Sequence, residues 1–234
     1  MNAVRTGETP VPRWGKDTRY ASELFRRFWY AMRRCWWHSY WQLNVSGIEN
    51  VPRRGPVLLC ANHTSHLDAI AILAALPTPM ALRTGTAVAR DVFGERVVQK
   101  SISRVLTGAV SVTRKGDFAG GLRELERVLR DRRPLILFPE WRRSPDGNLV
   151  ELKQGAAMLA IRTGTPIVPI RLGGLRESLA RGKHVPLPGP VTVRFGEPID
   201  PRPYRDAIAS GRMDRRAAYQ QLTHEIRSAI ERMT

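Results

Sequence analysis

Short apolar runs alternate with longer segments of helical periodicity along most of the chain. The strand-like runs cover 42–47, 56–62, 109–113, 134–138, 166–170 and 191–195, and the helix-like segments cover 67–76, 91–106, 117–131, 153–163 and 215–232. This alternation predicts an α/β fold, a single domain with a mixed, mostly parallel sheet flanked by helices. The length of 234 residues fits one such domain. The stretch 173–190, rich in Gly, Pro and Arg, is predicted to be a long loop.

Two further segments precede this domain. Residues 1–18 are rich in Pro, Gly and Thr, which predicts a flexible leader, and no signal peptide is evident. Residues 19–43 are predicted to form an amphipathic helix. Its apolar side carries Leu24, Phe25, Phe28, Trp29, Met32, Cys35 and Trp36, and its basic side carries Arg26, Arg27, Arg33 and Arg34 together with Tyr30, Trp37 and Trp41.

A basic helix rich in Trp and Phe is typical of an anchor that lies in the membrane interface. Spanning is disfavoured, because four arginines near the bilayer centre cost roughly 10 to 14 kcal/mol. On an anionic surface each basic residue gains about 1 kcal/mol instead. We therefore expect a peripheral, monotopic protein at the cytoplasmic face of an anionic membrane, with residues 44–234 as its catalytic domain. An ordinary helix packed on the domain is the alternative.

The net charge of +17 indicates a polyanionic partner, which can be nucleic acid, a membrane or a phosphorylated substrate. No nucleic-acid-binding motif accompanies the scattered arginines, so no specific nucleic-acid partner is expected. The two cysteines, Cys35 and Cys60, show neither metal-ligand spacing nor a disulfide framework. Both are expected to be free, buried thiols.

The first polar cluster follows the apolar run 56–62 in the sequence NHTSHLD. His63 stands at a predicted turn from strand to helix, a usual place for a functional residue, with Thr64 and Ser65 as candidate helix caps. Asp68 follows five residues later, where it can hydrogen-bond the imidazole of His63. A carboxylate in that position fixes the tautomer and supports the imidazolium, so the pair can act as a general base.

Other interpretations of this cluster exist. Ser65, His66 and Asp68 resemble a hydrolase triad, but no nucleophile elbow surrounds the serine, and three side chains within four residues cannot adopt triad geometry. A metal site from His63, His66 and Asp68 stays open, although no further ligand is evident nearby. A capping His–Asp pair without chemistry also stays open.

Basic residues follow two other strand-like runs. Guanidinium groups at strand ends suit a phosphate or a carboxylate. Because the carboxyl ends of parallel strands meet at one edge of a sheet, these residues and the His63–Asp68 pair are predicted to form one site. They are Arg114 and Lys115 after one run, and Glu140, Arg142, Arg143 and Ser144 after Pro139 at the end of another. A further proline, Pro169, lies inside the run 166–170 and predicts an edge, a bulge or a strand end there.

Four segments together resemble the glycerolipid and lysophospholipid acyltransferase family. NHTSHLD is similar to the N-H-x4-D block, the stretch from Gly108 to Arg114 to the second block (G-x-x-x-V-x-R), FPEWRRS to the third block (usually FPEGTRS), and TPIVPI to the fourth. The flanking sequences VSGIENVPRRGPV, KQGAAMLA and FGEPI agree as well. The resemblance therefore runs in order from about residue 44 to about residue 200.

This resemblance implies acyl transfer without a metal, a cofactor or an acyl-enzyme. His63 would be the general base that deprotonates the acceptor hydroxyl, and Asp68 would orient it, supported by Asn62. The donor would be acyl-CoA or acyl-carrier protein, and the acceptor a lysophospholipid, with 1-acyl-glycerol-3-phosphate, which gives phosphatidic acid, as the commonest case. Arg114 and Arg143 would bind the acceptor phosphate, Glu140 would help shape that pocket, and Val168, Pro169 and Ile170 would line the apolar side near the acyl chain. Lys115 and Arg142 are further candidates for substrate binding.

The third block departs from the family pattern. Trp141 and Arg142 stand where Gly and Thr are usual, whereas Ser144 matches. A positive φ at that Gly would strain a tryptophan. We expect Trp141 to narrow the acceptor site and Arg142 to add a second contact to an anion. Other acceptors therefore stay open, among them glycerol-3-phosphate, a lyso-ornithine lipid, another lysophospholipid or a specialised metabolite.

Overall fold

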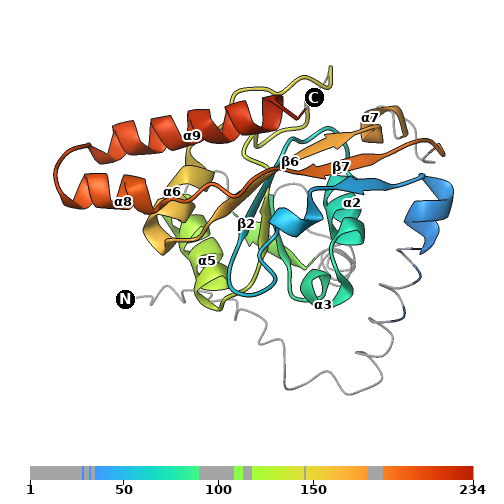
Figure 1. Cartoon of the computed structure of the whole chain (residues 1–234), viewed down its shortest axis with the longest axis horizontal. Coiled ribbons are helices and arrows are strands. Elements are labelled where there is room, and N and C mark those ends of the chain that lie inside the picture. The colour runs from blue at the N-terminus through green and yellow to red at the C-terminus, as the bar shows by residue number, and fades with distance from the viewer. Residues whose placement is uncertain are drawn as a thin grey trace, which may run out of the picture.

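The computed structural model describes Phe28, Met32 and residues 35–89, 108–112, 118–144, 146–178 and 187–233 (Figure 1). The predicted leader 1–18, most of the predicted helix 19–43 before residue 35, and the predicted helix 91–106 lie outside these residues.

Seven strands of the described chain form one sheet in the order β1-β7-β6-β2-β5-β3-β4. Every neighbouring pair is parallel except β6 and β7, which are antiparallel. The predicted mixed, mostly parallel sheet is therefore confirmed. The strands are β1 (Asn44–Ser46), β2 (Leu58–Ala61), β3 (Gly85–Ala89), β4 (Ala109–Val112), β5 (Leu135–Leu137), β6 (Ile167–Gly173) and β7 (Thr192–Phe195).

Helices connect most of these strands. They are η1 (Ile48–Asn50), α2 (Asp68–Ala75), α3 (Thr78–Ala81), α5 (Phe118–Arg130), α6 (Gly155–Thr163), α7 (Leu175–Ser178), α8 (Arg202–Ala209) and α9 (Arg215–Glu231). The predictions match α2, α5, α6 and α9 closely and miss η1, α3 and α8. The predicted loop 173–190 is wrong at its start, where it contains the end of β6 and α7.

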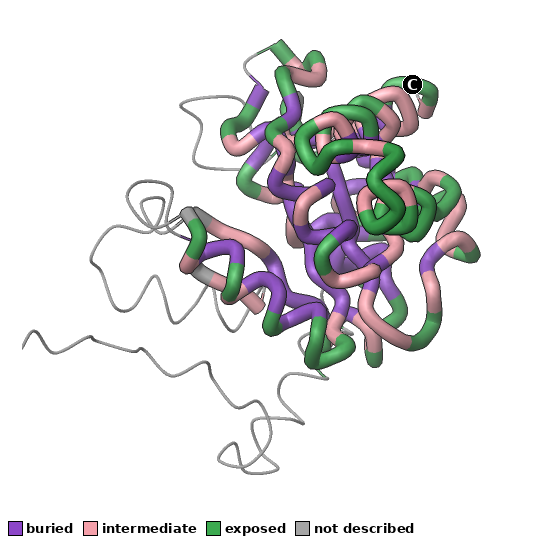
Figure 2. The backbone as a smooth tube through the Cα atoms, turned by 90° about the vertical axis from the view of Figure 1, so that its left-hand side faces the viewer, coloured by how far each residue is buried: buried purple, intermediate pink, exposed green. Residues whose placement is uncertain are grey.

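Alternating side chains of the central strands divide the interior into two layers. Leu59 of β2 and Val168 of β6 face a cluster with α2 and α3, which we call the α2 face. Leu58 of β2 and Ile167 of β6 face a cluster with α5, α6 and α9, which we call the α9 face. The buried chain runs through the middle of the molecule and the exposed chain around it (Figure 2). The sheet thus has a helical layer on each side, as buried parallel strands require.

The described end of the predicted interfacial helix has two different surfaces. Residues 35–40 are helical, and Trp37 and Trp41 are 1% and 2% exposed in the α2 face. The expectation that Trp37 and Trp41 lie on the basic side of an interfacial helix is therefore wrong, because both side chains pack into the core of the domain. Trp36, Met32 and Phe28 are exposed, as their predicted apolar side allows. Cys35 is exposed and Cys60 is buried, so the prediction of two buried thiols holds for Cys60 alone.

No helix within the described ranges is both long enough and apolar enough to cross a bilayer.

Candidate active site

His63 and Asp68 form a close pair just beyond the carboxyl end of β2. Nδ1 of His63 lies 2.8 Å from Oδ2 of Asp68, whose side chain is fully buried, whereas the His63 side chain is 23% exposed. A proton on Nδ1 donated to this carboxylate leaves the lone pair of Nε2 free. The predicted hydrogen bond between the two side chains is present.

Asp68 also gathers the backbone that leads into α2. Its Oδ2 accepts the N–H groups of Thr64 at 2.6 Å and Ser65 at 2.9 Å. The prediction that Thr64 and Ser65 cap the helix is wrong, because Leu67 is the cap residue and no side chain caps α2. Asp68 stands in the first turn of α2, where the helix dipole favours a negative charge. The carboxylate is thereby fixed in one position beside His63.

The ring of His63 is fixed from a second side. It stacks on Phe138, which follows β5, with ring centroids 4.3 Å apart and an interplanar angle of 22°. Ser65, the serine of the rejected triad, is buried, and its Oγ accepts the N–H of Leu67. The cluster therefore presents an oriented imidazole and no exposed serine nucleophile among these residues.

Asn62 extends the pairing of β2 beyond the end of the strand. Its side-chain oxygen accepts the N–H of Leu172 at 2.7 Å, and its amide donates to the carbonyl oxygen of Leu172 at 3.1 Å. The side chain thus takes the place of a backbone partner for β6. Asn62 is 1% exposed, so it supports the position of His63 from within the sheet.

Glu140 lies beneath the loop of His63 and is 3% exposed. Its Oε1 accepts the N–H of His63 at 2.7 Å, and its Oε2 accepts the N–H of Val150 at 2.9 Å. Burial raises the pKa of this carboxyl, and the two N–H groups lower it in part. Ser144 is also buried, and its N–H donates to the carbonyl oxygen of His63 at 2.7 Å. The third block therefore holds the first one in place.

Trp141 adopts the backbone conformation expected of the glycine it replaces. Its φ is +58°, in the left-handed region, so the predicted strain at this position is present. Its ring packs against the α9 face and reaches Gly155 at the start of α6. His63 instead stacks on Phe138, which packs against the α2 face. The Trp141 ring therefore lies on the other face of the sheet from Phe138, and this placement does not support the expected narrowing of the acceptor site.

Arg142 and Arg143 are both exposed directly after Trp141. In the part of the chain that the structure describes, neither guanidinium pairs with a carboxylate. His66 belongs to the same region, although the sequence suggests it only as a triad or metal residue. Partial burial lowers the pKa of His66, and the neighbouring charges of Arg143 and His63 lower it further. The positive character of this region suits an anionic group.

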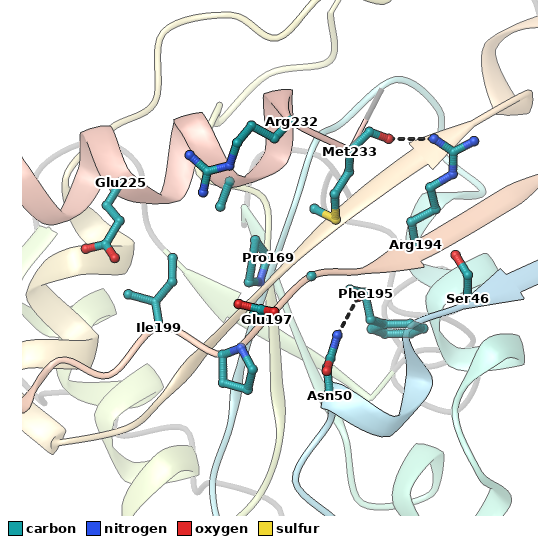
Figure 3. A pocket seen from close by; sticks show the side chains of 13 residues that line it. Ser46, Asn50, Pro169, Arg194, Phe195, Glu197, Ile199, Glu225, Arg232 and Met233 are labelled. Atoms are coloured by element: carbon teal, nitrogen blue, oxygen red, sulfur yellow. Dashed lines mark hydrogen bonds between the residues drawn. The ribbon is translucent and has the colours of Figure 1, made fainter.

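The residues of the fourth block point to opposite faces of the sheet. Val168 and Ile170 are fully buried in the α2 face. Pro169 lines a cavity of about 560 Å³ below the C-terminal end of α9, together with Phe195 and Met233 (Figure 3). Neither His63 nor Asp68 lines this cavity. Val168, Pro169 and Ile170 therefore do not line one common pocket in the described structure.

Pro169 lies in the interior of the sheet, where it marks a bulge. β6 and β7 pair with Ile170 opposite Phe195, but the next bridge joins Ile167 to Ile199. Between these two pairs, the two residues Val168 and Pro169 thus lie opposite the three residues 196–198. A bulge accommodates a residue that has no N–H, which confirms that alternative among the predictions.

Arg114 and Lys115 lie outside the described residues. Val112, the last described residue before them, ends β4, three strands away from β2 in the sheet. The glycine of the second block has a clear structural reason: Gly108 has a φ of +62°, and a Cβ there would strike the carbonyl oxygen of Thr84.

Among the described residues, no group of three or more His, Cys, Asp or Glu side chains is arranged to hold a metal ion. The imidazole Nδ1 and the carboxylate of the predicted ligand set are engaged with each other.

Comparison with known proteins gives three kinds of similarity. A family model described as Acyltransferase matches residues 42–173. The 1-acyl-sn-glycerol-3-phosphate acyltransferase of Borreliella burgdorferi is 26% identical over 147 residues, which are 60% of this chain and 56% of that protein. A protein of the same name from Chlamydomonas reinhardtii is 30% identical over 173 residues, 72% of this chain and 50% of that protein. The chain spans about half the length of the curated relatives it matches.

A solved structure is similar in fold. The crystal structure of the 1-acyl-sn-glycerophosphate (LPA) acyltransferase PlsC from Thermotoga maritima superimposes with a TM-score of 0.65 at 22% identity. The match covers 94% of this chain and 84% of that one.

Proposed function

The chain belongs to the acyltransferase family, and from this premise we propose that it transfers a fatty acyl group from a thioester donor to the free hydroxyl of a lysophospholipid. The observation that carries the proposal is the pair of His63 and Asp68. A buried carboxylate 2.8 Å from Nδ1 and a partly exposed ring make an oriented general base at the edge of the sheet.

The proposed reaction is a direct transfer. Nε2 of His63 takes the proton of the acceptor hydroxyl as its oxygen attacks the thioester carbonyl carbon. Asp68 supports the imidazolium that forms. The tetrahedral intermediate then expels the thiolate, which receives the proton from Nε2, so an ester bond forms and the thioester bond breaks. The donor is acyl-CoA or acyl-carrier protein, and no acyl-enzyme is needed.

We propose 1-acyl-glycerol-3-phosphate as the acceptor, with phosphatidic acid as the product. Two observations support this choice. Curated relatives carry the name of that activity, and the exposed Arg142 and Arg143 are without a carboxylate partner in the described chain. A phosphomonoester of an acceptor would supply that partner. Residues Arg114 and Lys115 are assigned to the same phosphate, and Val168 and Ile170 to the apolar interior beside the site.

The test measures thiol release from palmitoyl-CoA together with formation of phosphatidic acid, with and without lysophosphatidate. We expect His63→Ala to lower the rate by about 10²- to 10⁴-fold, the usual contribution of a positioned base. His224→Ala, an exposed histidine on α9, is the matched control and should keep full activity.

Retained turnover in a folded His63→Ala protein would contradict the proposed base. Thiol release without a new phospholipid would show hydrolysis instead of transfer. Turnover with glycerol-3-phosphate or a lyso-ornithine lipid, but not with lysophosphatidate, would keep the chemistry and change the acceptor.

We further propose that the site works at the cytoplasmic surface of an anionic membrane. The large hydrophobic side chains that are exposed in the described chain are Phe28, Met32, Trp36 and Leu187. Two of them are linked through Trp41: Trp36 contacts Trp41 at 5.1 Å between ring centroids, and the indole N–H of Trp41 donates to the carbonyl oxygen of Leu187 at 3.1 Å. Exposed apolar side chains, in a segment whose sequence also carries four arginines, fit an anionic bilayer surface.

Vesicle co-sedimentation tests this surface. A Trp36→Ser, Leu187→Ser double variant should bind anionic vesicles more weakly than the wild type. Ile208→Ser on α8, at the opposite end of the molecule in Figure 1, is the control. Equal binding by all three proteins would contradict the proposed surface.

A further inference from the structure

The carboxylate of Glu140 joins the backbone of His63 to a segment outside the four blocks. One oxygen holds the N–H of His63, and the other holds the N–H of Val150. Because Glu140 is buried and both oxygens accept backbone N–H groups, its position depends on where Val150 lies. A displacement of Val150 would therefore be felt at His63, whose ring carries the proposed proton transfer.

Val150 is held in turn by the C-terminal helix. Arg227 of α9 donates from Nη1 to the carbonyl oxygen of Val150 at 3.1 Å and from Nη2 to that of Leu149 at 3.2 Å. Nη2 also lies 2.8 Å from Oε1 of Glu231, one turn further along the helix. The planar guanidinium is thus oriented by a carboxylate and donates to two successive carbonyl groups from two nitrogens in a fixed geometry, which a lysine ammonium does not reproduce.

Arg227 is not part of the packed side of α9. The side chains that attach this helix to the domain are the buried Ala218, Leu222, Ile226 and Ile230. The Arg227 side chain is 34% exposed, and its contacts to the carbonyl groups of Leu149 and Val150 lie away from that packed side. Its removal therefore leaves the apolar attachment of α9 intact.

We propose that Arg227 is a positioning residue for the acyl-transfer site: by holding the carbonyl groups of Leu149 and Val150, it fixes the Val150 N–H against Glu140 and, through Glu140, the backbone of His63. This inference rests on the proposed function of His63 as the general base. It makes the C-terminal helix part of the machinery that orients the imidazole, although no residue of that helix belongs to the family blocks.

The first arm of the test is kinetic. In Arg227→Ala we expect kcat to fall roughly 10- to 100-fold, since a small displacement of a reacting group has that effect. KM for donor and acceptor should change by less than about twofold, because no substrate contact is removed. Arg227→Lys keeps the positive charge and one donor group, so its kcat should lie between those of the wild type and Arg227→Ala. Arg216→Ala, an exposed arginine on the same helix, is the matched control and should match the wild type.

The second arm reads His63 without substrate. In protein with ¹³C-labelled histidine, the NMR signal that is absent from His63→Ala is assigned to His63 and recorded at one fixed pH. We expect its chemical shift to change in Arg227→Ala and not in Arg216→Ala. This arm separates the two proposals: a changed signal in a protein that transfers no acyl group would overturn the proposed function and leave the link to Arg227 standing.

The third arm is a double-mutant cycle with Glu140→Gln. A glutamine amide faces one of the two N–H donors, so this variant breaks the same link. If Arg227 acts through Glu140, the double variant should be no slower than Glu140→Gln alone. Additive losses, or an Arg227→Ala protein that equals Arg216→Ala in kcat and in the His63 signal, would refute the inference.

Discussion

Trp141 carries the most direct energetic prediction, because its backbone has a φ of +58°. We compare Trp141→Gly with Trp141→Ala, which both remove the indole and differ by a single Cβ. The left-handed conformation costs an alanine about 1 to 2 kcal/mol. The unfolded chain of the glycine variant is more flexible, which lowers the stability of that variant relative to the alanine variant by about 0.4 to 1 kcal/mol. Trp141→Gly should therefore be the more stable of the two by roughly 0.5 to 1 kcal/mol.

Urea unfolding followed by circular dichroism measures this difference, which should appear as a shift of the midpoint at an unchanged slope. Gln221 is an exposed position in the interior of α9, and its variants Gln221→Gly and Gln221→Ala serve as the control pair. There the alanine variant should be the more stable one by about 1 kcal/mol. The sign must therefore reverse between the two sites. An alanine at position 141 as stable as the glycine, with the control pair behaving normally, would refute the argument from backbone strain.

Three further predictions follow from buried and hydrogen-bonded groups. Asn62→Ala leaves the buried N–H and C=O groups of Leu172 without their partner, so the free energy of unfolding should fall by roughly 2 to 4 kcal/mol in urea titrations. Cys60 is buried, which raises the pKa of its thiol, whereas Cys35 is exposed. Ellman's reagent should therefore react with the Cys35 thiol in the native protein and with the Cys60 thiol only after unfolding. Fast reaction of both thiols in the native protein would contradict this. Hydrogen bonds from Asn148 and Ser144 lower the pKa of Asp146 to about 2. Because this pKa lies below that of the unfolded chain, the stabilisation is present above about pH 4 and is lost toward pH 2, and Asp146→Asn should lose stability less steeply over that range than the wild type.

Most strands could be predicted because they are short apolar runs with polar neighbours, as in β2 and β6. β3 escaped prediction because its sequence GTAVA is made of small residues, and its position is set by pairing with β4 and β5. α8 was missed because it has only eight residues and no buried side chain, and only Tyr204 and Ile208 pack partly against the α9 face. In both cases the local pattern is weak and the surrounding fold decides.

The parts of the site that could be predicted are those in which one side chain hydrogen-bonds another. The spacing of His63 and Asp68 in the sequence is enough to predict their hydrogen bond. The contacts of Glu140 were not predictable, because its partners are backbone N–H groups, one of them 77 residues away, which leave no mark on the sequence. Arg227 was missed for the same reason, since it binds two carbonyl oxygens. Helical periodicity also placed Trp37 wrongly, because it cannot show that this side chain packs into the α2 face.

The burial of Trp37 and Trp41 beside the exposed Trp36 has a mechanical consequence. A helix joined to its domain by a loose hinge would let the domain swing freely above whatever surface it touches. Here successive residues of one turn are divided between the interior of the domain and its outside. A surface that binds Trp36 therefore fixes the tilt of the whole sheet relative to that surface. The same tilt sets the direction in which the sheet edge with His63 faces.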